Sequence, residues 1–235
     1  MDRTYRRSNR PDHCRRRQGH GGDTVKCFPI NLDIEGKKVL VVGGGQVARR
    51  KVKSLASCGA RVTVVSPCFC KSLARMKGIH RVTRRYRKAD LAGACLVVGA
   101  TDSQEVNRRI SEHAKTVGLP VNIVDQPNLC TFTVPAVVSR GDILIAISTG
   151  GGSPALSGRI RRHIEKHFDP AFATHLELLR QMRPLVRSSS LNLSQRSALL
   201  KTMASDKMLR ILKKKGAAFT GRHLLQMLAD SVKAT

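Results

Sequence analysis

The chain has 235 residues, of which 41% are hydrophobic and 3% aromatic, and its 43 Lys and Arg against 16 Asp and Glu give a net charge of +27. This length is enough for one large domain or two small ones with a hydrophobic core. Scarce aromatic residues disfavour a stacking platform for single-stranded nucleic acid, and no apolar run is long enough to cross a membrane. The basic excess extends along the whole chain and fits either a nucleic-acid partner or a small polyanionic ligand.

The first 25 residues are polar and rich in Arg and Gly, so we expect a disordered basic tail without the apolar segment of a secretory signal. The seven cysteines are odd in number and lack zinc-ligand spacing. The closest pair, Cys68 and Cys70, is expected in a loop. These features favour a cytoplasmic protein, because disulfide frameworks belong to exported chains.

Short strands alternate with helices from residue 26 to residue 125. This pattern predicts an α/β fold of Rossmann type, a parallel sheet with right-handed crossovers. The predicted strands are 38–42, 60–67, 80–87, 94–101 and 120–125, and the predicted helices are 46–59, 71–78 and 103–118.

The pattern changes after residue 125. Residues 131–149 predict two strands joined by a turn at Arg140-Gly141-Asp142, and a loop and a helix follow to residue 168. The remainder is predicted to be helical, with breaks near 184–192 and at Lys215-Gly216, and with Ser194 and Thr220 as helix N-caps. We therefore expect a tail (1–25), a Rossmann domain (26–125), a small β-containing element (126–168) and a helical domain (169–235).

A glycine loop of the form G-x-G-x-x-A, made by Gly43, Gly45 and Ala48, follows the first predicted strand and opens the first helix. The first glycine permits a tight turn, the second lets the backbone approach a pyrophosphate, and the small third residue allows close helix packing. The free N–H groups of the helix N-terminus then face the diphosphate. This context predicts dinucleotide binding by Gly43, Gly44, Gly45, Gln46 and Val47. The alternative is a glycine turn without a ligand.

The second strand ends at Ser66-Pro67 instead of the acid that binds a ribose 2′-hydroxyl in many NAD-binding domains. Ser66 can hydrogen-bond a ribose hydroxyl but discriminates less sharply against a 2′-phosphate. We favour NAD over NADP. Thr101 and Asp102 end the fourth predicted strand at its carboxyl side, where α/β sheets bind ligands.

Asp125 ends the apolar run from Val121 to Val124, one of few acids in a basic chain. One interpretation is a general base at the mouth of a buried strand. The other is turn chemistry, because Asp-x-Pro often initiates a turn.

Two further motifs follow. The loop 148–154 contains Thr149 and Gly150, with Ser153 as the expected N-cap and Pro154 as the first helical residue. It is either a flexible capped loop or a donor site for a substrate carboxylate. His163 and His167 lie four apart on one helix, but the order is not that of a zinc protease, and we predict no metal site.

Taken in order, the stretches "FPINLDIEGKKVLVVGGGQVARRKV", "GATDSQEVNRRI" and "PVNIVDQPNLCTFTVPAVVSRGDILIAISTGGGSPALSGRIRRHIE" resemble the precorrin-2 dehydrogenase / sirohydrochlorin ferrochelatase family, the first module of siroheme synthases. The resemblance covers about residues 27–170. It implies a homodimer whose central element dimerises, and NAD-dependent oxidation of precorrin-2 to sirohydrochlorin. In some members the insertion of ferrous ion follows, and the identity of the metal, iron or cobalt, stays open. It also implies that Asp125 is catalytic, that Thr101 and Asp102 lie beside the cofactor and that Thr149, Gly150 and Ser153 bind substrate.

A polycarboxylate substrate accounts for the basic charge, so a nucleic-acid partner is not expected. The main alternative function is a non-catalytic NAD-sensing module with a basic helical tail. A short-chain NADP reductase needs a Tyr-x-x-x-Lys pair, and Asp90 stands four residues after Tyr86. That class is therefore excluded.

Overall fold

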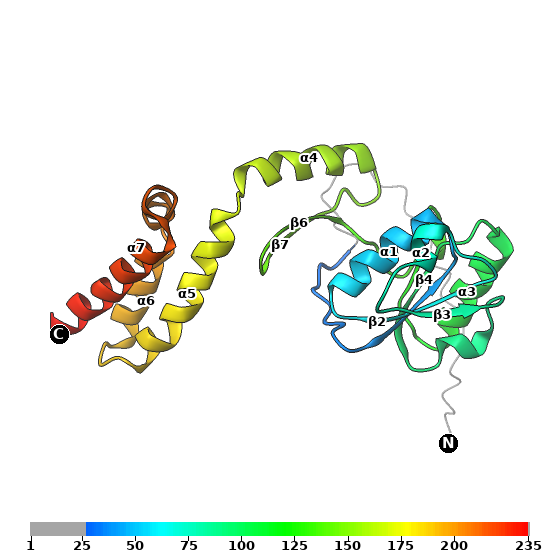
Figure 1. Ribbon diagram of the computed structural model, residues 1–235, viewed down its shortest axis with the longest axis horizontal. Helices are drawn as coiled ribbons and strands as arrows, with labels where there is room; N and C mark the ends of the chain where they lie inside the picture. The colour runs from blue at the N-terminus through cyan, green and yellow to red at the C-terminus, as the bar shows by residue number, and fades with distance from the viewer. Residues whose placement is uncertain (1–26, 235) are drawn as a thin grey trace, which may run out of the picture. The chain divides into compact units, whose positions relative to one another are not determined.

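The computed structural model describes residues 27–234, so the predicted tail at 1–25 lies outside the described residues. The chain divides into two units between residues 30 and 31. All helices and strands of the described residues lie in the second unit. The first half of this unit is a five-stranded sheet in the order β3-β2-β1-β4-β5, in which every neighbouring pair is parallel (Figure 1). The expected Rossmann-type α/β fold is confirmed. Its elements are β1 (Lys38–Val42), α1 (Gln46–Ser57), β2 (Arg61–Ser66), α2 (Lys71–Ala74), β3 (His80–Thr83), the 3₁₀ turn η1 (Lys88–Leu91), β4 (Ala94–Gly99), α3 (Gln104–Thr116) and β5 (Val121–Ile123).

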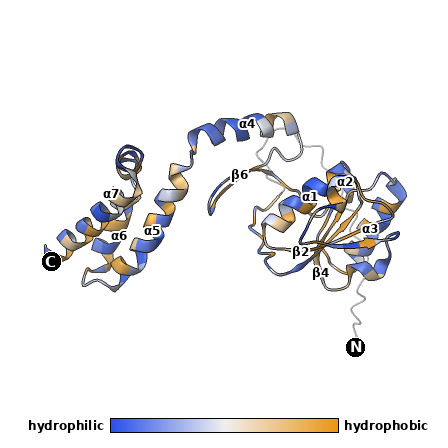
Figure 2. Cartoon of the chain, viewed as in Figure 1, coloured by the Kyte–Doolittle hydropathy of each residue, from blue (hydrophilic) through white to orange (hydrophobic). Residues whose placement is uncertain are grey.

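Both faces of the sheet are buried, which explains the continuous apolar runs of its central strands. Val39 and Val41 of β1 face a cluster that includes Val52 of α1, whereas Leu40 and Val42 face a second cluster that includes Ile110 of α3. Successive side chains of a strand point to opposite faces, so one apolar strand supplies both layers. In Figure 2 the central strands of the sheet, such as β2 and β4, carry the hydrophobic colour, and the helices show a hydrophilic side as well.

Beyond β5 the chain forms a 3₁₀ turn and then a two-stranded antiparallel sheet. Gly141 has a φ of 57° in the predicted hairpin turn. Arg140 is anchored on α4, because its guanidinium donates to the backbone oxygens of Phe168 and Glu165. These elements are η2 (Pro127–Leu129), β6 (Ala136–Arg140), β7 (Ile143–Ile147) and α4 (Pro154–His167).

The last part of the chain consists of the helices α5 (Ala171–Ser188), α6 (Leu193–Met203) and α7 (Asp206–Lys233), packed around a cluster that includes Met182, Met203 and Leu224. The predicted break at Gly216 is present as a kink with φ 79° and ψ 172° inside α7.

Both N-caps predicted in this region were wrong. Asn192 caps α6 in a reciprocal capping box with Gln195, so Ser194 lies inside the helix. Thr220 is buried within α7, where its hydroxyl donates to the oxygen of Gly216. Within the described residues no helix is long and apolar enough to cross a membrane.

Candidate functional site: a nucleotide crevice beside Asp125

The carboxyl ends of the parallel strands meet at one edge of the sheet, and the glycine loop lies where the strand order reverses. Strands β2 and β3 continue the chain on one side of β1, and β4 and β5 lie on the other side. This reversal is the usual ligand site of an open α/β sheet. We refer to the region outside the carboxyl ends of the strands, around the glycine loop 43–45, as the crevice. The backbone N–H of Gly43 donates to Val65 of β2 at 2.9 Å, and Ala100, beyond β4, donates to Val42 at 2.8 Å. The loop is thus attached to both neighbouring strands.

The three glycines of the loop have different reasons to be glycine. A Cβ on Gly43, which has a φ of 128°, would lie 2.1 Å from the oxygen of Ala100. A Cβ on Gly44 would lie 1.8 Å from the oxygen of Cys68. A Cβ on Gly45 would meet nothing within 4 Å. Packing within the protein therefore accounts for the first two glycines, whereas the third faces open space where a ligand can approach the backbone.

The N-terminus of α1 has the properties of a phosphate site. Gly45 is its N-cap, no side chain accepts a hydrogen bond there, and its first turn contains no acidic residue. In contrast, α3 and α4 are capped by the side chains of Ser103 and Ser153. The first N–H groups of a helix need an acceptor, and the helix dipole favours an anion at that position. Gln46 is exposed and Val47 half-buried in this first turn.

The residues proposed to hold the ribose are more constrained than the sequence suggests. Ser66 is buried, and its hydroxyl donates to the oxygen of Cys68 at 2.7 Å. It can therefore accept a hydrogen bond from a ribose hydroxyl, but its own proton is engaged inside the protein. Two residues beyond β4, Thr101 is half-buried and donates to Oδ1 of Asn107 at 2.8 Å, whereas Asp102 is exposed.

Asp125 is exposed two residues beyond the end of β5, next to β4, which ends at Gly99. Val124 donates to Gly99 of β4 at 2.9 Å, which places the carboxylate at the same edge of the sheet as the glycine loop. Asp125 has a φ of 58° and is the one described non-glycine residue with positive φ. Such a conformation costs free energy, although Asp and Asn tolerate it better than most residues.

Lys51 of α1 interacts electrostatically with Asp125. Burial lowers the pKa of the Lys51 ammonium, Arg50 lowers it further, and the charges of Asp125 and Cys130 act in the opposite direction. Lys51 is half-buried on α1 and is thus a basic group whose pKa responds to the Asp125 carboxylate.

The residues predicted to bind substrate form a local structure between β7 and α4. Thr149 and Ser153 are linked twice, because the Thr149 hydroxyl donates to the Ser153 oxygen and accepts from the Ser153 N–H. Ser153 caps α4 by accepting from Leu156, and Pro154 is the first helical residue, as predicted. Gly150 has a φ of 61° and is exposed. The loop is therefore held at its base and open at its glycines.

His163 and His167 are exposed on α4, and no group of three or more metal-ligating side chains occurs among residues 27–234. Sequence reasoning missed three residues of the crevice: Lys51, Asn107 and Cys130. Cys130 was missed because the spacing of cysteines indicates only zinc sites and disulfides. Asn107 was missed because a polar residue on the inner face of a helix gives no local sign that it supports the preceding loop.

The fold and its glycine loop define a nicotinamide-dinucleotide-binding protein of Rossmann type. Residues 30–136 match a family of NAD(P)-binding domains, and residues 140–167 match the central segment of sirohaem biosynthesis proteins. The siroheme synthase of Thioalkalivibrio sulfidiphilus is 41% identical over 164 residues, which are 68% of this chain and 34% of that protein. The siroheme synthase of Methylobacillus flagellatus is 45% identical over 145 residues, which are 60% of this chain and 31% of that protein. The chain thus aligns with about a third of the length of these relatives.

The solved structure of SirC, a precorrin-2 dehydrogenase, superposes with a TM-score of 0.70 at 27% identity and covers 87% of this chain and 100% of its own. The chain belongs to the precorrin-2 dehydrogenase family, the family of the first module of siroheme synthases.

Proposed function

We propose that the protein oxidises precorrin-2 to sirohydrochlorin with NAD as hydride acceptor. The observation that carries the proposal is the exposed carboxylate of Asp125 at the edge of the sheet that also presents the open glycine loop. The reaction transfers a hydride to the nicotinamide and a proton to a base, and a carboxylate within reach of the substrate serves as that base. The relatives named siroheme synthase and precorrin-2 dehydrogenase support the same reaction.

In this proposal the chain binds the dinucleotide through the backbone of Gly43, Gly44 and Gly45 and the first turn of α1, with Gln46 and Val47 beside the diphosphate. The bound cofactor supplies a hydride acceptor. Ser66, Thr101 and Asp102 line the crevice around the rest of the dinucleotide. Thr149, Gly150 and Ser153 offer hydroxyl and backbone N–H groups to the substrate carboxylates.

We propose NAD rather than NADP because no basic side chain directly follows β2. The residues after Ser66 are Pro67, Cys68 and Phe69, and the first basic residue is Lys71 in α2. A 2′-phosphate needs an Arg or Lys close to the ribose. Calorimetry with both cofactors tests this choice, and tighter binding of NADP would overturn it.

We further propose that the chain acts as a homodimer through the element 126–168. The face of the hairpin that carries Val137 and Leu144 is exposed, with 38% and 52% of these side chains accessible. Analytical ultracentrifugation of the intact protein and of Leu144→Lys tests the interface. A dimer that is unchanged by the lysine would place the interface elsewhere.

All cysteines among the described residues are free, which supports a cytoplasmic location.

Metal insertion into sirohydrochlorin is the second candidate activity. It removes two pyrrole N–H protons, and Asp125 is exposed where a base is needed. The ferrous or cobaltous ion is a substrate of this reaction, not a resident cofactor.

Mixing the purified protein with precorrin-2 and NAD, and recording absorption spectra with and without each ion, tests both activities. Conversion to sirohydrochlorin only in the presence of NAD supports the dehydrogenase, and a further metal-dependent change supports the chelatase. NAD binding without turnover would instead support a non-catalytic sensing module.

A further inference from the structure

The turn that carries Asp125 is closed by a single side chain, the thiol of Cys130. Its Sγ accepts a hydrogen bond from the N–H of Ile123 at 3.1 Å and contacts Nδ2 of Asn122 at 3.7 Å. The same sulfur lies 3.2 Å from the oxygen of Ile123 and 3.3 Å from the oxygen of Gln126, which are the acceptors for its proton. These two residues flank Asp125, so the thiol bridges the turn from the residue two before it to the residue after it.

The backbone of β5 needs this partner. Ile123 is 2% exposed, and a buried N–H without an acceptor destabilises the folded state. Strand β5 is an edge strand that pairs with β4 on one side. On its other side the returning chain supplies the partners, because Thr131 donates its N–H to Val121 at 2.8 Å and accepts from the Val121 N–H through Oγ1 at 2.9 Å. Cys130 continues this pairing two residues further along β5, at Ile123, toward Asp125.

The left-handed conformation of Asp125 makes its direction sensitive to this closure. A residue with φ of 58° persists there only when the surrounding structure holds it. The backbone also contributes, since Gln126 donates to the oxygen of Ile123 at 3.3 Å, near the limit of a hydrogen bond. The thiol shares that oxygen and adds the second contact at Gln126.

The segment from Val124 to Phe132 also packs against helix α1. Val124 and Phe132, at the two ends of the segment, pack against the cluster that contains Ala48 and Val52 of the same helix.

We propose that Cys130 is a positioning residue for catalysis, whose thiol holds the turn 123–126 so that the Asp125 carboxylate faces the bound substrate. This inference rests on the proposed role of Asp125 as the base. The thiol itself neither touches the reacting atoms nor exchanges a proton with them. Its effect is expected on the rate of the chemical step and not on cofactor or substrate binding.

Three substitutions at this position separate hydrogen bonding from volume. Cys130→Val keeps an apolar side chain of similar size without hydrogen bonds, Cys130→Ala removes the bonds without added bulk, and Cys130→Ser keeps a donor and acceptor. Cys95→Val is the matched control, because Cys95 is half-buried on β4 against the first core cluster. All four are compared with the intact protein, using precorrin-2 and NAD in steady-state and single-turnover assays.

For Cys130→Val we expect kcat to fall at least ~10-fold while KM for precorrin-2 and Kd for NAD stay within about threefold, because a misplaced Asp125 carboxylate slows the chemical step without removing a contact to cofactor or substrate. Cys130→Ser should recover about a third of the wild-type kcat, and Cys95→Val should retain it. In an Asp125→Asn background, Cys130→Val should lower the residual single-turnover rate by less than about twofold, since a residue that acts through Asp125 has nothing left to position.

A folded Cys130→Val enzyme with wild-type kcat, or an equal further loss in the Asp125→Asn background, would overturn the proposal. If the valine variant does not fold, the comparison of Ser with Ala decides, and equal losses in those two variants would refute the hydrogen-bonding role. Asp125→Asn alone tests the proposed function separately. A wild-type rate in that variant would reject the base, whatever the cysteine variants show.

Discussion

Thr101 and Asn107 are joined by a reciprocal pair of hydrogen bonds at the start of α3. The Thr101 hydroxyl donates to Oδ1 of Asn107 at 2.8 Å, and Nδ2 of Asn107 donates to the Thr101 oxygen at 2.9 Å. Asn107 is 2% exposed, so both of its polar atoms depend on these contacts. The pair fixes the loop between β4 and α3, where we propose that the dinucleotide lies.

Replacing Asn107 with leucine should loosen this loop. We expect a loss of about 1–3 kcal/mol in the free energy of unfolding, because the Thr101 backbone oxygen loses its amide donor and the Thr101 hydroxyl keeps only the oxygen of Ser103 as acceptor. We also expect at least ~5-fold weaker NAD binding, since the cofactor must then order the loop. Calorimetry and denaturant unfolding measure the two effects, with the exposed Gln104→Leu on the same helix as control. A destabilised variant with unchanged NAD affinity would make Asn107 purely structural.

The glycine loop predicts opposite outcomes at adjacent positions. Gly45→Val should fold, at a cost of about 1 kcal/mol at this N-cap, because its backbone is extended and a Cβ meets nothing within 4 Å. It should nevertheless abolish NAD binding, since the side chain occupies the space of the diphosphate. Gly44→Ala should lose about 3 kcal/mol of stability, because its Cβ overlaps the oxygen of Cys68. Calorimetry showing wild-type NAD affinity in folded Gly45→Val would place the diphosphate elsewhere.

The central part of this crevice could be predicted from the sequence because its signals are local. A strand, G-x-G-x-x-A and a helix follow one another within 38–57, and the burial of both sheet faces appears directly as apolar runs. The supports of the crevice could not be predicted in this way. Asn107 and Cys130 act through contacts with residues 6 and 7 positions away in the chain, and their partners are defined only when the loops fold back.

The helical part shows a different limit. Both Ser194 and the true cap Asn192 are good N-cap residues, and the choice between them is made by Gln195, which completes a capping box with Asn192. Thr220 resembles a cap in sequence but is buried behind the kink at Gly216. Composition alone does not reveal on which side of a helix break such a residue lies.

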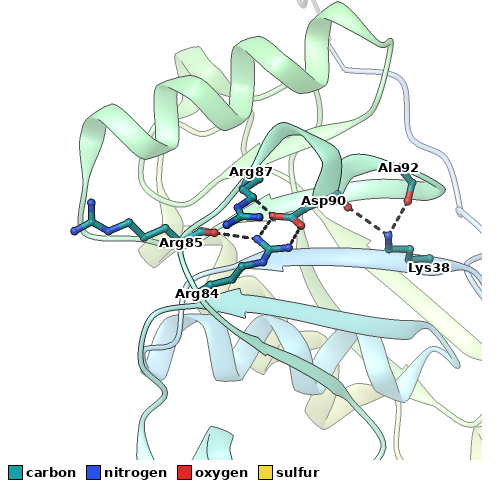
Figure 3. A network of polar contacts seen from close by, with 6 residues as sticks. All are labelled: Lys38, Arg84, Arg85, Arg87, Asp90 and Ala92. Atoms are coloured by element: carbon teal, nitrogen blue, oxygen red, sulfur yellow. Dashed lines mark hydrogen bonds and ion pairs between the residues drawn. The ribbon is translucent and has the colours of Figure 1, made fainter.

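Asp90 gives a pH-dependent prediction outside the crevice (Figure 3). Its carboxylate accepts hydrogen bonds from the Arg84 guanidinium and from the Arg87 N–H, while its own backbone oxygen accepts from Lys38. Burial raises the pKa of Asp90, but the bonds from Arg84 and Arg87 outweigh it and the pKa is lowered below 3.8. A carboxyl group whose pKa is depressed by folding stabilises the protein above its unfolded pKa, and this stabilisation is lost as pH falls through the folded value.

Asp90→Asn should therefore cost about 1–3 kcal/mol of unfolding free energy at neutral pH, with a difference from wild type that shrinks below about pH 4. Urea unfolding at several pH values measures this difference. Asp102→Asn is the control, because Asp102 is exposed and belongs to no ion pair among the described residues. A difference that stays constant down to low pH would show that the carboxylate charge is not what holds the turn.

Asp125→Asn is the sharpest test of the proposed reaction. Asparagine has the size of aspartate and tolerates the left-handed conformation at φ 58°, so the turn closed by Cys130 is expected to remain. The amide cannot accept the substrate proton, and a positioned general base typically contributes 10²–10⁴-fold in rate. We therefore expect a folded protein with wild-type NAD affinity and a dehydrogenation rate at least ~100-fold lower. Chelatase activity should fall by a smaller factor, because metal insertion proceeds slowly without a protein base. Calorimetry establishes that the cofactor site is intact, and absorption spectra follow sirohydrochlorin. If the folded variant turns over precorrin-2 at the wild-type rate, Asp125 is a turn residue and the base must be sought among the other groups of the crevice, beginning with Lys51.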